Sequence, residues 1–315
     1  METAQLSFLP PQEPQADTRV DAPLDARTSL HRAAEAFHAH LISEERSLNT
    51  IRAFDSDLRL LQSYLGTRAV IGHIRHADLD SFVRYLRQGR GVRCNAKSLS
   101  RRVTTLRVFF GWLTDTRVVS SDPAALLTHP RVATPLPRVL SASEVNLLLA
   151  ATEGMRTDTA REDARPHVLA TLLLSTGIKK GECMALTVLD IDPSDSEGPS
   201  VFIHYDTVRH RHKERRLRLP AGFGQVLEEY LRQYQPASRL FECSARNLEY
   251  VLDQASRRAG LPARRACFEV LRYTCALRDL RDGVEPDTLR RKLGVSEITW
   301  IETLAKLQRL NTPVI

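Results

Sequence analysis

The stretch that most constrains the fold runs from Cys267 to Leu304, near the end of the 315-residue sequence. Its apolar residues recur at helical spacing until Gly283, which predicts one helix. Pro286 and Gly294 then delimit a second helix, because Pro is favoured in the first turn of a helix and Gly directly after its end. A third helix is predicted from Glu297 to Leu310. Three consecutive helices favour a mainly α-helical domain.

Arg272 lies one turn inside the first of these helices, among residues of a type that fills protein cores. An Arg in such a place is usually structural, because its stem packs on apolar neighbours while its head finds a partner or water. It can also hold a phosphate through two parallel hydrogen bonds. This stretch alone favours the structural interpretation.

Composition restricts the function classes. The net charge is +7, the sequence pI is about 9.4, and 42% of the residues are hydrophobic. No apolar run approaches the roughly 18 residues of a membrane span, so we expect no membrane partner. The basic excess consists mainly of Arg, which suits bidentate contacts with phosphate. Together with the clustering of Arg on particular segments, this favours nucleic acid as the partner.

The cysteines are odd in number and show no C-x-x-C spacing. This pattern argues against a disulfide framework and against a zinc site, and it predicts a protein of the reducing cytoplasm. His210 and His212 stand two residues apart, but no acidic or Cys residues accompany them in a ligand pattern. We therefore expect neither a metal nor a cofactor.

Four segments are expected along the chain. Residues 1–28, rich in Pro, Gln and Asp, predict a disordered tail. Residues 29–117 predict a four-helix domain, residues 118–139 a Pro-rich linker, and residues 140–315 a second domain. Within the second domain, Val201 to Pro220 predicts two strands around a tight turn, and this segment carries the densest basic run of the sequence.

Four ordered sequence motifs connect the two domains to a known family. They are S-L-N-T at 47–50, K-S-L-S-R-R at 97–102, T-G-I-K-K-G-E at 176–182, and the stretch from Cys267 to Leu304. In order and spacing they resemble the tyrosine recombinase family, which includes the phage integrases and the Xer recombinases. The resemblance implies a mainly α fold with a small antiparallel β-sheet: a SAM-like four-helix core-binding domain, then an α+β catalytic-type domain, together forming a clamp on double-stranded DNA.

The resemblance also implies a catalytic set. The family cleaves DNA by attack of a Tyr on a phosphodiester, while Arg and His side chains stabilise the transition state and a Lys protonates the leaving oxygen. The corresponding positions here are Lys179, His210, Glu269, Arg272, Val295 and Leu304. Only Arg272 is unchanged. Leu304 stands where the nucleophile belongs, and an alkyl side chain cannot act as one.

Carried over in the same way, the family's DNA contacts fall on polar and basic residues of both domains. They are Asn49, Thr50, Arg52, Lys97, Ser98, Arg101, Arg102, Lys179, Arg211, Lys213, Arg215 and Arg272. We expect part of the basic run of the 201–220 segment, including Arg211, Lys213 and Arg215, to follow a DNA backbone from alternating sides of a hairpin. Glu269 is expected either to repel a phosphate or to pair with Arg272, three residues away.

These observations predict a DNA-binding protein without strand cleavage, acting as an accessory or regulator in recombination or integration of a mobile element. It would be a bacterial protein associated with the nucleoid when bound to DNA. The last helix is expected either to pack on its own domain or to dock on a second copy or an active recombinase. Two alternatives remain: an active recombinase that uses another nucleophile such as Tyr273, and a protein-interaction module without DNA binding, against which the basic clusters argue.

Overall fold

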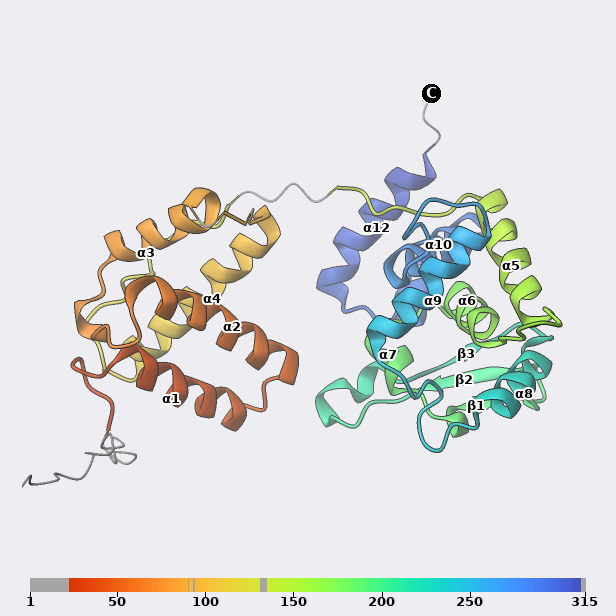
Figure 1. Ribbon diagram of the computed structural model, residues 1–315, viewed down its shortest axis with the longest axis horizontal. Helices are drawn as coiled ribbons and strands as arrows, with labels where there is room; N and C mark the ends of the chain where they lie inside the picture. Colours follow the sequence, from red (N-terminus) through yellow and green to blue (C-terminus); the bar gives the residue numbers. More distant parts are fainter. Residues whose placement is uncertain (1–22, 90, 93, 131–134, 313–315) are drawn as a thin grey trace, which may run out of the picture. The chain divides into compact units, whose positions relative to one another are not determined.

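The computed structural model describes residues 23–89, 91–92, 94–130 and 135–312. The chain divides into two compact units, residues 1–134 and residues 135–315 (Figure 1). Each unit has its own hydrophobic core, so each is described separately. No helix among the described residues is long and apolar enough to cross a membrane.

In its described part, the first unit is built from four α-helices, as predicted for residues 29–117. They are α1 (Leu30–Ser43), α2 (Leu48–Leu65), α3 (His76–Arg84), which continues into a π-helical turn at Tyr85–Gly89, and α4 (Ala96–Asp115). Side chains of Ser29, Ser47 and Asn95 cap α1, α2 and α4 by accepting a hydrogen bond from the third helical amide, which satisfies one of the free amide groups of each first turn.

Both ends of the predicted first domain need correction. Of the predicted tail, residues 1–22 lie outside the described residues, whereas the Thr28 carbonyl accepts a hydrogen bond from the Ile71 amide at 3.0 Å. Residues 118–130 were assigned to the linker, but Val119, Ala124 and Leu127 are buried in the core of the first unit. Prolines in this segment marked a change of composition, yet the apolar residues between them are buried and keep it on the domain.

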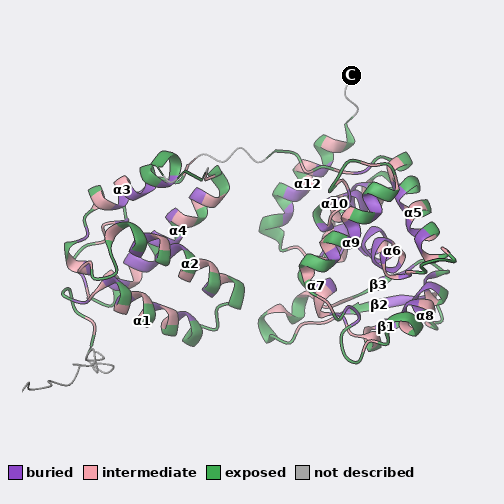
Figure 2. Cartoon of the chain, in the orientation of Figure 1, coloured by how far each residue is buried: buried purple, intermediate pink, exposed green. Residues whose placement is uncertain are grey.

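Among the residues that the structure describes, the second unit combines eight α-helices with a small sheet. The helices are α5 (Ala142–Arg156), α6 (Arg165–Thr176), α7 (Lys180–Ala185), α8 (Phe223–Tyr234), α9 (Ala245–Arg258), α10 (Phe268–Arg281), α11 (Pro286–Lys292) and α12 (Glu297–Asn311). Helices α6 and α10 carry the most continuous buried surface of this unit (Figure 2). The three helices predicted from the C-terminal stretch are α10, α11 and α12.

The sheet has three antiparallel strands in the order β1 (Ile191–Asp192), β2 (Ser200–Ile203) and β3 (Arg215–Arg218). Val201 pairs with Ile191 on one side and with Leu217 on the other. The fold class predicted from the sequence is thus confirmed: a mainly helical chain of two domains with a small antiparallel sheet.

The connection between β2 and β3 is not the predicted tight turn. Residues 208–213 form a 3-10 helix whose side chains are all outside the core. The residues of this segment are mostly basic, so no apolar side chain packs it onto the sheet. Val208, its one apolar residue, is 74% exposed. Local hydrogen bonds, such as that from the His210 amide to the Thr207 carbonyl at 2.9 Å, then favour a helical turn.

Candidate functional site

The end of α11 is the centre of the candidate site, because three successive backbone carbonyls there accept hydrogen bonds from three cations. Arg215 Nε donates to the Lys292 carbonyl at 2.7 Å, Arg272 Nη2 to the Leu293 carbonyl at 2.7 Å, and Lys179 Nζ to the Gly294 carbonyl at 2.8 Å. The last carbonyls of a helix lack partners within it and carry partial negative charge, so they attract cations.

The chain can turn here because Gly294 adopts a left-handed conformation with φ of 57°. A Cβ at this position would lie 2.7 Å from Nη1 of Arg215. The absence of a side chain therefore serves both the turn and the close approach of the guanidinium group.

Glu182 is the anionic partner of this cluster. Its carboxylate, in the first turn of α7, accepts hydrogen bonds from Arg215 Nη2 at 3.0 Å, from the Lys179 amide at 2.8 Å and from the Tyr205 hydroxyl. Burial alone would raise the pKa of Glu182, but the hydrogen bond and charge of Arg215 outweigh it and hold that pKa below its usual range. Burial and the bond to Glu182 raise the pKa of Tyr205 to about 12.

Among the predicted phosphate contacts of the cluster, Arg272 and Lys179 differ in how their charge responds to pH. Arg272 is half-buried and also donates to the Gly177 carbonyl; burial lowers its pKa, yet a guanidinium remains charged at neutral pH. For Lys179, burial lowers the pKa to about 8, against the opposing charge of Glu182. The Lys179 side chain therefore gains or loses its charge near pH 8, which lies within the usual pH range of protein experiments.

A cavity of about 210 Å³ opens beside these cations. Lys179, Lys213, Arg272, Tyr273 and Val295 line it, together with hydroxyl-bearing residues near the start of α12: Ser296, Thr299 and Thr303. The structure thus brings four positions predicted from the sequence, Lys179, Lys213, Arg272 and Val295, to one small polar cavity. Its chemistry suits an anion.

Three other positions of the predicted catalytic set lie outside this cavity. Glu269 is exposed on α10, and no ion pair with Arg272 forms among the described residues, because Arg272 turns instead to backbone carbonyls. Leu304 packs in the apolar cluster formed by α10, α11 and α12. His210, on the 3-10 helix, contacts the Thr207 hydroxyl at 3.1 Å; burial and the charge of Lys213 lower the pKa of its imidazole.

In the first unit, a buried carboxylate again engages predicted DNA contacts. Asp57 on α2 is 2% exposed and accepts bonds from Arg101 Nη2 at 2.8 Å and from the Thr105 hydroxyl at 2.9 Å. Arg102 Nε lies 3.5 Å from the same carboxylate, and its Nη1 donates to Cys94 Sγ at 2.7 Å. Here burial outweighs the partners, so that the pKa of Asp57 is raised.

The remaining predicted DNA contacts are closer to solvent. Asn49, Arg52, Lys97 and Arg211 are exposed, and Thr50, Ser98 and Lys213 are half-buried. Of these, Arg52, Lys97 and Arg211 form no ion pair with any described residue. The predicted set therefore divides into cations that the fold uses and cations that remain available to a ligand.

Sequence reasoning missed a second group of available cations. A cavity of about 460 Å³ is lined by Arg138, before α5, and by Arg246, Tyr250, Arg257 and Arg264 on and after α9. Arg257 pairs with Asp253, whereas the guanidinium groups of Arg138, Arg246 and Arg264 form no ion pair among the described residues. These arginines are spread along the sequence, so no run of basic residues marked them.

Comparison with known proteins shows which proteins the chain resembles. A family profile described as "Phage integrase, N-terminal SAM-like domain" matches residues 34–117. The tyrosine recombinase XerD of Listeria monocytogenes is 29% identical over 277 residues, which cover 86% of each chain. In sequence the chain is therefore similar to the tyrosine recombinases. The tyrosine recombinase XerC of Roseiflexus sp. is 34% identical over 203 residues, but that match spans 62% of this chain and 59% of the relative's length.

Solved structures of tyrosine recombinases share the fold. A structure of the Tn1549 transposon integrase in complex with a circular intermediate DNA matches with a TM-score of 0.68 at 14% identity, covering 90% of this chain and 99% of that one. A lambda integrase dimer bound to a COC′ core site matches with a TM-score of 0.64 at 15% identity, covering 88% and 77%. At such low identity the likeness concerns the arrangement of helices and strands, and the roles of residues in this chain rest on their own geometry.

Proposed function

We propose that this protein is a tyrosine recombinase family member that binds double-stranded DNA without cleaving it by the family's tyrosine route. It would serve as an accessory or regulator of recombination or integration, acting on DNA in the bacterial nucleoid. The observation that carries this proposal is Leu304, an alkyl side chain packed among apolar neighbours at the position where the family resemblance calls for a nucleophile. Covalent catalysis requires a lone pair on the attacking atom.

Binding itself is supported by cations that the fold leaves free. Arg52 and Lys97 in the first unit, and Arg138, Arg211 and Arg246 in the second, have no carboxylate partner among the described residues. Unpaired cations on both units suit a polyanion, because each phosphate contact releases condensed counterions. The related integrases bound to DNA make DNA the polyanion that this arrangement fits best.

The cations of the cavity beside α11 have another use. Arg272, Arg215 and Lys179 each donate to a carbonyl of the turn that follows α11, so part of their hydrogen-bonding capacity stabilises the domain. An ammonium has three donors and a guanidinium five, which leaves some for a phosphate. The proposal therefore assigns the cavity to phosphate binding and not to transition-state stabilisation.

Assembly with another protomer is the second part of the proposal. Helix α12 packs on its own unit through Trp300, Thr303 and Leu307, while Ile298 is 87% exposed and Ile301 is 74% exposed. Two neighbouring exposed isoleucines favour contact with a further apolar surface, either of a copy of this chain or of an active recombinase. Because Trp300 and Leu307 are buried, the test should replace Ile298 and Ile301 by Ser and leave the helix in place. Unchanged oligomerisation on DNA would exclude this contact.

The test of the whole proposal uses nicked DNA with candidate sites from the genomic neighbourhood of the gene. The mixture is separated on native and on denaturing gels. A shift on the native gel, without an adduct that survives SDS, is the expected result. A shift that does not weaken with rising salt would contradict the proposed phosphate contacts. A covalent protein–DNA adduct that survives SDS would contradict the proposed absence of strand cleavage.

One observation favours an active enzyme as the second candidate. Tyr273 lines the same cavity as Arg272 and Lys179, so a phenol does lie near the cations that would orient a phosphate. If Tyr273 is the nucleophile, the wild-type protein forms an SDS-resistant adduct that Tyr273→Phe abolishes. Thr303→Val, in the same cavity, is the matched control and should leave such an adduct intact.

A further inference from the structure

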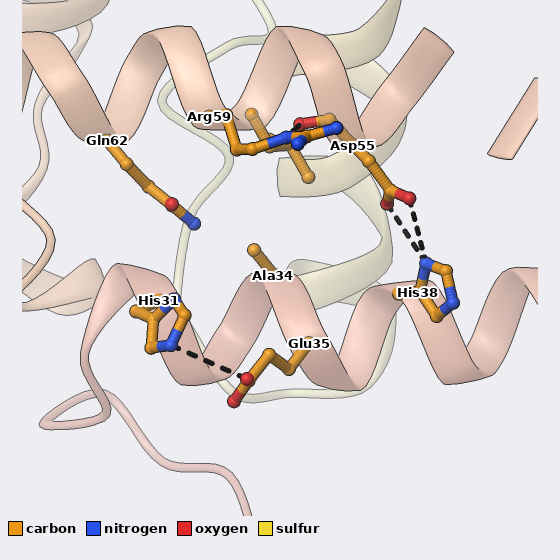
Figure 3. A pocket seen from close by; sticks show the side chains of 8 residues that line it. His31, Ala34, Glu35, His38, Asp55, Arg59 and Gln62 are labelled. Carbon is orange, nitrogen blue, oxygen red and sulfur yellow. Dashed lines mark hydrogen bonds and ion pairs between the residues drawn. The ribbon is translucent and has the colours of Figure 1, made fainter. Parts of the chain in front are cut away.

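The first unit contains a groove that the proposed function does not use. It lies between α1 and α2, has a volume of about 410 Å³, and is distinct from the Asp57 cluster (Figure 3). Ala34 and Leu58 form its apolar floor, and Gln62, Arg59 and Glu35 surround it. All of these residues belong to two well-packed helices of the same unit, so the groove is a preformed feature of that domain.

Gln62 is the unusual residue of the groove. It is only 8% exposed, and Figure 3 shows its side chain directed toward the space between the helices. The amide group forms no hydrogen bond with any other described residue. The amide nitrogen and oxygen are not fully enclosed, so water in the groove can meet their hydrogen-bonding capacity in the free protein. A bound ligand would replace that water as donor and acceptor.

The groove also contains charged groups: two imidazole–carboxylate pairs and Arg59, the one permanent cation among its lining residues. His38 Nδ1 lies 3.0 Å from Asp55, and His31 Nε2 lies 3.4 Å from Glu35, so each imidazole faces a carboxylate. Arg59 donates only through Nε, to the backbone carbonyl of Asp55 at 3.3 Å. Its two terminal nitrogens have no partner among the described residues, and they form the fork that suits a carboxylate.

We propose that this groove binds a small organic carboxylate that also carries an amide group. The carboxylate would pair with the terminal nitrogens of Arg59, the amide would exchange hydrogen bonds with Gln62, and the connecting carbons would lie on Ala34 and Leu58. Nothing in this arrangement calls for DNA, so the site can be tested independently of the DNA-binding proposal.

The experiment follows the backbone and side-chain amide resonances of the full-length protein by NMR during titration with three probes. N-acetylglycine carries both groups, N-acetylglycinamide lacks the charge, and butyrate lacks the amide. We expect N-acetylglycine to bind in the millimolar range and to shift the Gln62 side-chain signals. Removing the charge should weaken binding about tenfold and removing the amide about fivefold.

Two substitutions separate the two contacts. Arg59→Gln should abolish the advantage of N-acetylglycine over N-acetylglycinamide, and Gln62→Leu should abolish its advantage over butyrate. Absence of shifts in α1 and α2 with all three probes would overturn the proposal, as would shifts that neither substitution alters.

The stability of Gln62→Leu distinguishes a ligand site from a structural residue. If the amide has no partner in the free protein, Leu at this position should leave the melting temperature unchanged or raise it, since a buried polar group is removed. A large loss of stability would mean that Gln62 serves the fold, and would contradict the proposal.

Discussion

Asp57 in the first unit and Glu182 in the second are two buried carboxylates that attract arginines, but their electrostatics differ. Around Glu182, partners outweigh burial and the pKa is lowered; around Asp57, burial outweighs the partners and the pKa is raised. The arginines differ as well. The side chain of Arg215 is 9% exposed, whereas that of Arg101 is 42% exposed. Because both carboxylates are deeply buried, the comparison teaches that a basic residue serves the fold or a ligand according to how far its own side chain reaches solvent.

The largest effect is expected at Glu182. Glu182→Gln leaves the buried guanidinium of Arg215 without its counter-charge, which should lower the free energy of unfolding by about 3–5 kcal/mol. Urea denaturation measures it. The matched control is Glu249→Gln, because Glu249 pairs with Lys180 at the surface and an exposed pair contributes about 0–1 kcal/mol. Equal losses in the two variants would contradict the central role assigned to Glu182.

Asp57 should be less costly to replace and should respond to pH in the opposite direction. Asp57→Asn keeps a hydrogen-bond partner for Thr105 and leaves Arg101 near solvent, so a loss of about 1–3 kcal/mol is expected at neutral pH. A carboxyl group whose pKa is raised by folding contributes most below its unfolded pKa of 3.8, and this contribution is lost as pH rises through the folded pKa.

Glu182 provides the contrast for that measurement. Its pKa is lowered from 4.5, so its contribution is present above pH 4.5 and is lost as pH falls through the folded pKa. Between pH 3 and pH 6, the difference in unfolding free energy between wild type and Asp57→Asn should therefore decrease as pH rises. The difference between wild type and Glu182→Gln should increase over the same range. Parallel slopes would show that the two carboxylates are electrostatically alike.

The available cations should change DNA affinity more than stability. Arg52→Ala and Lys97→Ala should each make the slope of log K against log salt shallower by about 0.9, because one phosphate contact is lost. Fluorescence anisotropy over a range of salt concentrations measures this slope. Arg84→Ala, which removes a surface cation already paired with Asp80, is the control and should leave the slope unchanged. An identical effect of all three substitutions would indicate only a nonspecific contribution of net charge.

The smallest effect is expected from the charge on Lys179. Because its pKa is about 8, the ammonium is charged at pH 7 and mostly neutral at pH 9, so its contribution to DNA binding should decline by a few fold over this range. Lys179→Arg should remove that part of the pH dependence, since Arg stays charged. A wild-type pH profile identical to that of Lys179→Arg would mean that Lys179 contacts no phosphate.

Local signals made most of the fold predictable from the sequence. Apolar spacing and the Pro and Gly residues at helix ends act within a few positions of each other, and they located the three C-terminal helices. The 3-10 helix at residues 208–213 was missed because charged residues can alternate without a sheet face to cover. The packing of residues 118–130 was missed because prolines do not reveal where the apolar residues between them are buried.

The candidate site was predictable in part. Motif spacing placed Lys179, Arg272 and Val295 at one cavity, since the resemblance supplied the three-dimensional arrangement. It could not show that Arg215 and Arg272 would donate to the carbonyls after α11, because those bonds join residues far apart in the sequence. The arginines around α9 were missed for the same reason.

The three carbonyls at the end of α11 bear on how such sequences evolve. A substitution at Arg215 or Arg272 would deprive that turn of a hydrogen-bond donor, so selection for a folded domain can preserve these residues whether or not the protein cleaves DNA. Retained basic residues are consequently a poor marker of an active recombinase. At the nucleophile position, a side chain that only fills space in α12 is sufficient for folding, so this position is free to change. The residue at this position is therefore the better marker of an active recombinase.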